Sequence, residues 1–208
     1  MRVLPSVYTH SQDVTAAAAW DSWTDSDRNR LEIDMLHDNI TRYGSVTRWL
    51  HWLMTLLIIQ QFFKLTDRIG EGEHWLGENF GPWHVSIGAL VLTLAVLRIA
   101  WVLSQLGHRP IHRGPTAPFV RLGHFALYVT MLLMPVTGIS YLLGNGYGLT
   151  VFGMELAERT DIETPWLATI GSVHSPLAWL FLGMVLGHTI AAFYHHWALR
   201  DDTMKRML

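Results

Sequence analysis

The stretch GSVHSPLAWLFLGMVLGHTIAAFYHH, from Gly171 to His196, decides the fold class. It is long and apolar enough to cross a bilayer, because a transmembrane helix needs about 20 predominantly apolar residues. It nevertheless contains four histidines: His174, His188, His195 and His196. Polar groups inside a span are costly and are candidates for function, so this stretch predicts a membrane helix with a chemical role.

The composition of the whole chain also points to a membrane protein. Of its 208 residues, 50% are hydrophobic and 15% are charged, and the mean hydropathy is +0.22. The formal net charge of -2 gives no electrostatic support for a nucleic-acid partner. There is no cysteine, which excludes disulfides, thiolate metal sites and cysteine-ligated iron–sulfur clusters.

Four apolar runs predict an all-α integral membrane protein built as a four-helix bundle. The runs extend from about Val46 to Phe63, Trp83 to Leu106, Phe119 to Leu143 and Val173 to Trp197. Basic residues gather before the first run, between the second and third, and after the fourth, whereas the other two connections are acidic. Because cytoplasmic loops carry an excess of Lys and Arg, we expect an N-in and C-in topology.

The beginning of the chain differs from the rest. Residues 1–41 are acidic, rich in Ala and Asp, and too few to build a core of their own. We expect them to form a polar cytoplasmic extension, either disordered or with one short helix, and residues 42–208 to form the bundle domain. An alternative is that translation starts at Met35.

The spacing of the histidines predicts two facing pairs. His174 and His188 are fourteen residues apart, which places them on one helix face and about 21 Å apart along the axis. His84 begins the second run at the depth of His174, and His51 lies in the first run at the depth of His188. Isolated membrane histidines usually make interhelical hydrogen bonds, but two matched pairs indicate an organised set.

Two facing imidazoles suit the two axial positions of a haem iron. Zinc usually needs three or four protein ligands, and no Cys, Asp or Glu accompanies these pairs. Arg98 lies fourteen residues after His84, and we expect it to pair with a propionate of the cytoplasmic-side haem; the alternative is snorkelling to the headgroups. Gly88, Gly183 and Gly187 are candidates for haem clearance or for ordinary helix packing.

Several motifs resemble the bacterial cytochrome b-561 family over roughly residues 42–208. They are RWLHWL in the first run, WHVSIG opening the second, LGHFALYVTMLLMPVTG in the third, H-x13-H-x6-HH in the fourth, and the closing RDDTMKRML. The fourteen-residue histidine spacing is also similar to the cytochrome b subunits of membrane formate dehydrogenases and hydrogenases.

The resemblance implies a multi-pass protein of the bacterial inner (cytoplasmic) membrane that holds two haem b groups and exchanges electrons with quinone. By this resemblance, His51 and His188 ligate the iron of the cytoplasmic-side haem, and His84 and His174 ligate the iron of the outer-side haem. Superoxide is a candidate donor in that family. The acidic extension departs from the family pattern, so its part in binding a partner is left open.

Two histidines that are not assigned as ligands, His124 and His195, have a candidate role in quinone chemistry. His195 and His124 should both lie near the inner surface at similar depth. Because imidazole titrates near neutral pH, they are candidates for proton transfer to a quinone or for hydrogen bonding to it. The alternative is that both are interfacial residues, as we expect for His196.

These features support three classes of function. The first is a quinone-linked oxidoreductase that moves electrons between an outer-face donor and the quinone pool. The second is a membrane anchor and electron conduit for a partner dehydrogenase or soluble cytochrome, docked on the acidic outer loops. The third is a transporter or structural membrane protein without haem. In each class membrane lipid surrounds the bundle.

Overall fold

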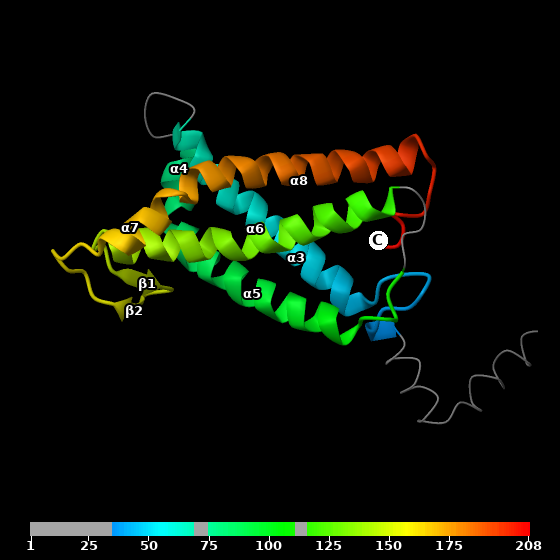
Figure 1. Ribbon diagram of the computed structural model, residues 1–208, viewed down its shortest axis with the longest axis horizontal. Helices are drawn as coiled ribbons and strands as arrows, with labels where there is room; N and C mark the ends of the chain where they lie inside the picture. Colours follow the sequence, from blue (N-terminus) through cyan, green and yellow to red (C-terminus); the bar gives the residue numbers. More distant parts are fainter. Residues whose placement is uncertain (1–34, 69–74, 111–115) are drawn as a thin grey trace, which may run out of the picture.

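The computed structural model describes residues 35–68, 75–110 and 116–208. Four long helices run side by side: α3 (Ser45–Phe62), α5 (His84–Ser104), α6 (Ala117–Gly144) and α8 (His174–Trp197) (Figure 1). Each begins and ends within two residues of a predicted run. The prediction of a helical protein is therefore confirmed, whereas the expected N-terminal extension lies mostly outside the described residues.

Three helical segments of the described chain are long and apolar enough to cross a membrane. They are Trp75–Ser104, Ala117–Gly144 and Pro165–Trp197. Helix α3 does not reach the same hydropathy, because Arg48, His51 and two glutamines interrupt its 18 residues. The helix forms as predicted, but its crossing of the membrane and the N-in, C-in orientation stay predictions.

The long helices pack in the order α3–α5–α6–α8. The closely packed backbone pairs are α3 with α5, α5 with α6, and α6 with α8. Helix α8 makes few close backbone contacts with α3 or α5 and meets them through side chains, such as Phe181 against Phe62 at 5.7 Å between ring centroids. The buried core consists of Met54, Val91, Ala95, Met131 and Phe181.

The start of α8 is fixed by a short preceding helix, α7 (Pro165–Ser172), which packs on the end of α6. A Cβ at Gly144 would overlap the backbone of Ala168, and a Cβ at Gly171 would overlap the backbone of Tyr141. These two glycines let the helices touch, and the contact sets the position of His174 at the first turn of α8.

A small hairpin between α6 and α7 was not predicted from the sequence. Strands β1 (Leu149–Val151) and β2 (Met154–Ala157) pair antiparallel through a turn at Phe152 and Gly153, where φ is 49° and 81°. Positive φ at both turn residues matches the twist of a two-residue hairpin. The Phe152 N–H donates to Ser86 Oγ at 2.9 Å, which anchors the turn to the start of α5.

Short helical segments join α3 to α5. They are two 3₁₀ helices, η1 (Phe63–Arg68) and η2 (Gly81–Trp83), and the six-residue helix α4 (Trp75–Phe80). None of them was indicated by the sequence pattern. They pack on one another at the end of the bundle where α3 ends and α5 begins.

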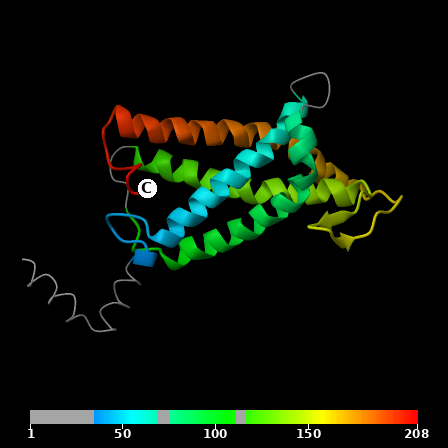
Figure 2. The same cartoon turned by 180° about the vertical axis from the view of Figure 1, so that it is seen from behind.

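The start of α3 and the end of the chain meet at one end of the bundle, which we call the inner end after the predicted orientation (Figure 2). Tyr43 N–H donates to Arg206 O at 3.2 Å, Arg48 Nη1 to Leu208 O at 2.7 Å, and Trp52 Nε1 to Met207 O at 3.1 Å. The hairpin and α7 lie at the opposite, outer end. The two ends of the described chain thus share one side of the bundle.

Residues 35–41 fall within the expected extension, yet they pack on the bundle. The Asp38 side chain is fully buried, accepts a hydrogen bond from Gly44 N–H at 2.8 Å and lies 2.9 Å from Arg109 Nε, just after α5. The Arg109 guanidinium lies 5.1 Å from the centre of the Tyr43 ring. The segment directly before α3 is therefore part of the folded inner end.

Candidate functional site

The structure brings two histidines together near the inner end. His51 on α3 and His188 on α8 face each other with ring centroids 6.4 Å apart and ring planes at 74°. Both side chains are half-buried between helices whose backbones are not closely packed. We call these two residues the inner pair.

A second pair lies near the outer end. His84 is the first residue of α5 and His174 the first residue of α8, and their ring centroids are 6.1 Å apart with planes at 86°. We call them the outer pair. The structure thus joins the same residues that the fourteen-residue spacing had matched by depth.

Both separations suit one metal ion between two imidazoles. If each nitrogen lies about 2 Å from the metal and each ring centre about 1 Å further back, the centroids are about 6 Å apart. The described residues contain no group of three or more His, Cys, Asp or Glu arranged to hold a metal ion alone. The geometry therefore fits a metal that arrives with its own equatorial ligands, as in haem.

Helix α6 holds the imidazole of His174. The His174 Nδ1 lies 2.9 Å from the carbonyl oxygen of Met134 and 3.1 Å from Thr137 Oγ1. A carbonyl only accepts, so Nδ1 carries the proton and Nε2 is left with the lone pair that a metal needs. Spacing along one helix does not predict this contact, although the proline and glycine in MPVTG are a signal of an unusual helix surface.

The histidine opposite has a polar atom without a hydrogen bond. His84 Nδ1 is buried and has no hydrogen-bond partner among the described residues. Buried polar atoms are normally satisfied, and an orphan one calls for an explanation such as a bound ion or cofactor. The outer pair therefore fits a haem on two grounds, the freed Nε2 of His174 and the orphan nitrogen of His84.

Arg98 on α5 reaches the inner pair. Its Nη2 lies 3.1 Å from His51 Nδ1, and its guanidinium carbon lies 5.5 Å from the centre of the Tyr128 ring. No ion pair of Arg98 with Asp or Glu is recorded in the described ranges. The residue is thus a half-buried cation beside one of the candidate ligands, and its pairing with a propionate stays a prediction.

Comparison with known protein families gives a decisive match. The model of a family described as prokaryotic cytochrome b561 matches residues 42–208, which is most of the chain. The chain belongs to the prokaryotic cytochrome b561 family. It is therefore a bacterial membrane protein of the b-type cytochromes, which bind haem b, and the predicted family is confirmed.

Three curated relatives of this family member are similar over nearly their whole length. Cytochrome b561 homolog 2 of Escherichia coli (strain K12) is 28% identical over 174 residues, covering 80% of this chain and 91% of the relative. Probable superoxide oxidase CybB of Yersinia pestis is 28% identical over 176 residues, covering 80% and 96%. Cytochrome b561 homolog 1 of Escherichia coli (strain K12) is 24% identical over 178 residues, covering 81% and 98%.

His124 and His195, the two candidates for quinone chemistry, do not lie at the same depth along the bundle. The His124 ring on α6 lies 5.3 Å from the His188 ring, and its Nδ1 lies 2.7 Å from the carbonyl oxygen of Val120. His195 is seven residues beyond His188 on α8, about 10 Å closer to the inner end. The structure thus places His124 beside the inner pair and His195 about two turns away.

His195 has a carboxylate partner that the sequence argument did not find. Its Nδ1 lies 2.6 Å from Asp201 Oδ2, and Asp201 returns to the helix end because Arg200 adopts a φ of 52°. Burial by itself raises the pKa of the Asp201 carboxyl, but hydrogen bonds from His195 and Thr203 outweigh it and lower that pKa to about 2. The carboxylate is therefore charged at neutral pH and fixes the orientation of the His195 ring.

The glycines of the long helices differ in how much space surrounds their Cα atoms. A Cβ at Gly183 or Gly187 would meet no described atom within 4 Å, and one at Gly88 would lie 3.7 Å from Gln61 Oε1. A Cβ at Gly138, which the sequence argument did not single out, would lie 3.0 Å from His174 Cε1. Gly138 is thus the glycine that directly admits a candidate ligand.

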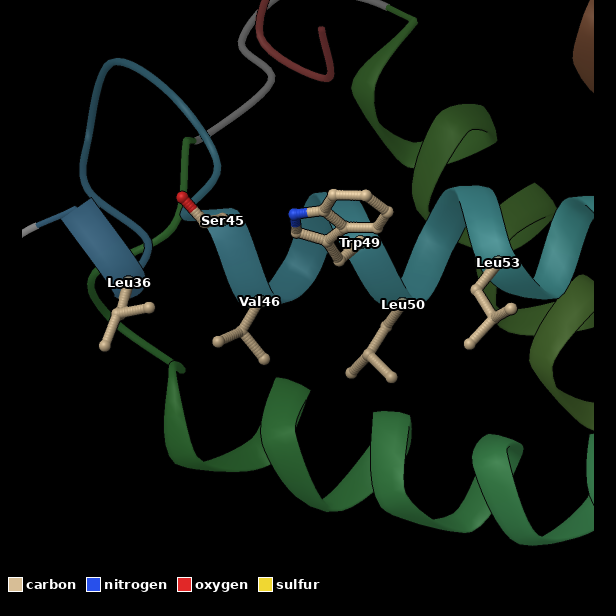
Figure 3. A pocket seen from close by; sticks show the side chains of 6 residues that line it. All are labelled: Leu36, Ser45, Val46, Trp49, Leu50 and Leu53. Atoms are coloured by element: carbon tan, nitrogen blue, oxygen red, sulfur yellow. The ribbon is translucent and has the colours of Figure 1, made fainter.

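A shallow apolar pocket of about 390 Å³ lies beside the first half of α3 (Figure 3). Its lining side chains are Leu36, Ser45, Val46, Trp49, Leu50 and Leu53, and the leucines of α3 point toward α5. None of the paired histidines lines it. The pocket lies against the first half of α3 near the inner end and does not belong to the candidate haem sites.

Proposed function

We propose that this cytochrome holds two haem b groups and transfers electrons across the bacterial inner membrane between an outer-face donor and the quinone pool. The inner pair, His51 and His188, would ligate one iron, and the outer pair, His84 and His174, the other. The observation that carries the proposal is the presence of two imidazole pairs, 6.4 Å and 6.1 Å between centroids, that share helix α8.

Bound haem b supplies an iron that is oxidised and reduced by one electron at a time. With a histidine on each side, the iron would have no open position, which would favour electron transfer over the binding of dioxygen. Met134 and Thr137 hold the His174 ring in the required tautomer. We expect Arg98, a half-buried cation beside His51, to pair with a propionate at the inner site.

Superoxide is one candidate donor, since a relative in Yersinia pestis is named a probable superoxide oxidase. Two superoxide ions would give one electron each and leave as dioxygen, and quinone would take two electrons and two protons to become quinol. The acidic residues after the hairpin disfavour an anion, but two exposed cations of the described residues, Lys64 and Arg159, lie at the outer end.

The quinone site would lie near the inner end. His195, held by Asp201, is a candidate for proton transfer to the quinone or for hydrogen bonding to it. His124 is a second candidate because it lies against the inner pair. A His195→Ala protein should keep both haems and lose quinone reduction, and unchanged turnover in that variant would remove His195 from the site.

The haem assignment is tested by the haem-to-protein ratio and the absorption spectrum of the purified chain. The wild-type protein should carry two b-type haems. His188→Ala and His84→Ala should each lose one of them, whereas His196→Ala, on the same helix as His188, should keep both. A folded wild-type protein without haem, or an unchanged haem content in both ligand variants, would refute the proposal.

A second candidate function is an electron conduit that serves a partner dehydrogenase or soluble cytochrome. The hairpin favours it, because Phe152, Met154 and Leu156 are exposed beside the acidic residues Glu155 and Glu158. Large exposed apolar side chains with a rim of one charge are typical of a docking surface. Quinone reduction by the purified chain with superoxide as donor would favour the enzyme, and co-purification of a redox subunit would favour the conduit.

A further inference from the structure

The two imidazole pairs stand in opposite electrostatic surroundings. At the outer pair, the His174 Nδ1–H faces two acceptors, the carbonyl oxygen of Met134 at 2.9 Å and the Thr137 hydroxyl oxygen at 3.1 Å. The Thr137 hydroxyl hydrogen is directed to Met134 O at 2.9 Å, so its lone pair is free for His174. At the inner pair, His51 faces the Arg98 guanidinium at 3.1 Å, which carries only donors.

These contacts have opposite effects on a ligated iron. A hydrogen bond from the second nitrogen of an axial imidazole to an oxygen makes the ring a better electron donor, which stabilises the oxidised iron. A positive charge nearby stabilises the reduced iron, because the reduced site carries one more negative charge. The outer surroundings therefore lower the reduction potential, and the inner surroundings raise it.

We propose that the inner pair forms a site of higher reduction potential than the outer pair, so that an electron rests preferentially at the inner site. This inference depends on the proposed function, since it needs a haem at each pair. It adds a direction: transfer from an outer-face donor to an acceptor at the inner end is downhill, and the reverse is uphill.

Other charges near the two sites do not cancel this difference. Among the side chains that the structure describes at the outer end, Lys64 and Arg159 are cations, but both are exposed, so water and salt screen them. Arg98 is half-buried against Tyr128 and lies 4.0 Å from Met54 Sδ, where screening is weaker. The half-buried cation therefore has the larger influence.

The present contact of Arg98 with His51 competes with ligation at the other ring nitrogen. A neutral imidazole that accepts at Nδ1 carries its proton on Nε2, where the iron would bind. Ligation by Nε2 thus requires the guanidinium to release Nδ1, and its charge then acts through space from the position that Tyr128 and α5 define. The proposed effect needs the charge of Arg98 and does not need that hydrogen bond. A propionate that pairs with Arg98, as proposed above, does not remove the effect, because the guanidinium then offsets a negative charge that would otherwise lie beside the inner iron.

The test is a redox titration of the purified holoprotein, followed by haem absorbance. His84→Ala, which should lack the outer haem, assigns the remaining signal to the inner site. Thr137→Val removes the hydroxyl at nearly constant volume and should shift only the outer potential upward, and Thr137→Ser should restore it. Thr130→Val is the matched control, because Thr130 is buried on the same helix and its hydroxyl meets Ala126 O and Met184 Sδ.

Arg98→Gln should shift only the inner potential downward, and Arg98→Lys, which keeps the charge, should shift it less. The wild-type protein should show the inner site above the outer site, and this order alone decides the inference if Arg98→Gln does not fold. Equal or reversed potentials in a two-haem protein, or Thr137→Val acting like Thr130→Val, would overturn the inference but leave the proposed function standing. Fewer than two haems in the wild-type protein would overturn both.

Discussion

Replacing Gly138 by alanine tests whether α6 positions the outer ligand. The new Cβ would lie 3.0 Å from His174 Cε1 and 3.3 Å from Nδ1. Carbon contacts are normally about 3.5 Å or longer, so the ring must retreat by about 0.5 Å. The bond from Nδ1 to Met134 O would then lengthen from 2.9 Å to about 3.4 Å, where little of it remains.

The energetic effect divides into a global and a local part. Alanine is about 1 kcal/mol better than glycine in a helix interior, which stabilises α6 as a whole. The local cost is about 1 kcal/mol for the lost hydrogen bond and about 1–3 kcal/mol if the tight packing must adjust. Because part of this strain can relax, we expect a net loss of about 1–3 kcal/mol in outer-haem binding, roughly 5- to 150-fold in affinity.

Gly123→Ala is the matched control, since Gly123 lies on the same helix and a Cβ there meets nothing within 4 Å. It receives the same gain in helix propensity without the steric contact. We would measure the haem-to-protein ratio during stepwise reconstitution, together with the thermal unfolding midpoint of each protein. A Gly138→Ala protein that binds the outer haem with the affinity and spectrum of the control would refute the reasoning.

Three further predictions concern the ends of the bundle. Arg109→Met should destabilise the protein by about 3–5 kcal/mol in chemical denaturation, because it leaves the buried Asp38 carboxylate unpaired; adding Asp38→Asn should recover part of that loss. Asp201→Asn should speed tryptic cleavage of the C-terminal tail at neutral pH. Since the Asp201 pKa is lowered to about 2, its contribution to wild-type stability should be complete above the ordinary value of 3.8 and vanish as the pH falls through 2, which acid titration of tail protection against pepsin can check. Phe152→Asn should raise the unfolding midpoint by a few degrees, because asparagine tolerates the positive φ of this turn better than phenylalanine.

The sequence was sufficient to predict the pairs because helix periodicity fixes what one helix presents. The spacing of His174 and His188 gave both the shared face and the axial separation, and hydropathy placed His51 and His84 at matching depths. The contacts that orient the rings could not be predicted in this way. They depend on how a second helix is displaced and rotated, which periodicity along one helix does not contain.

The same limit explains the missed partner of His195. Asp201 reaches it only because Arg200 takes a left-handed conformation that an arginine rarely adopts, and no local sequence rule indicates this. The hairpin turn is similar, since a phenylalanine before Gly153 is not a usual turn residue. Both unpredicted features depend on a non-glycine residue with positive φ, Phe152 or Arg200, where tertiary contacts outweigh the local backbone preference.

The position of helix α8 must satisfy two opposing requirements, one for its backbone and one for its histidine ligands. If a haem lies between each pair, the α8 backbone must stay away from α3 and α5, because the flat group needs that space, yet the helix must hold each ligand within about 0.5 Å of its place. In the structure α8 packs closely on α6 and α7 and meets α3 through side chains such as Phe181 against Phe62, while residues 134–138 of α6 contact the His174 ring. Helix α6, which carries none of the paired histidines, therefore largely sets the position of the ligands on α8. Substitutions on α6 should alter haem binding without changing a ligand.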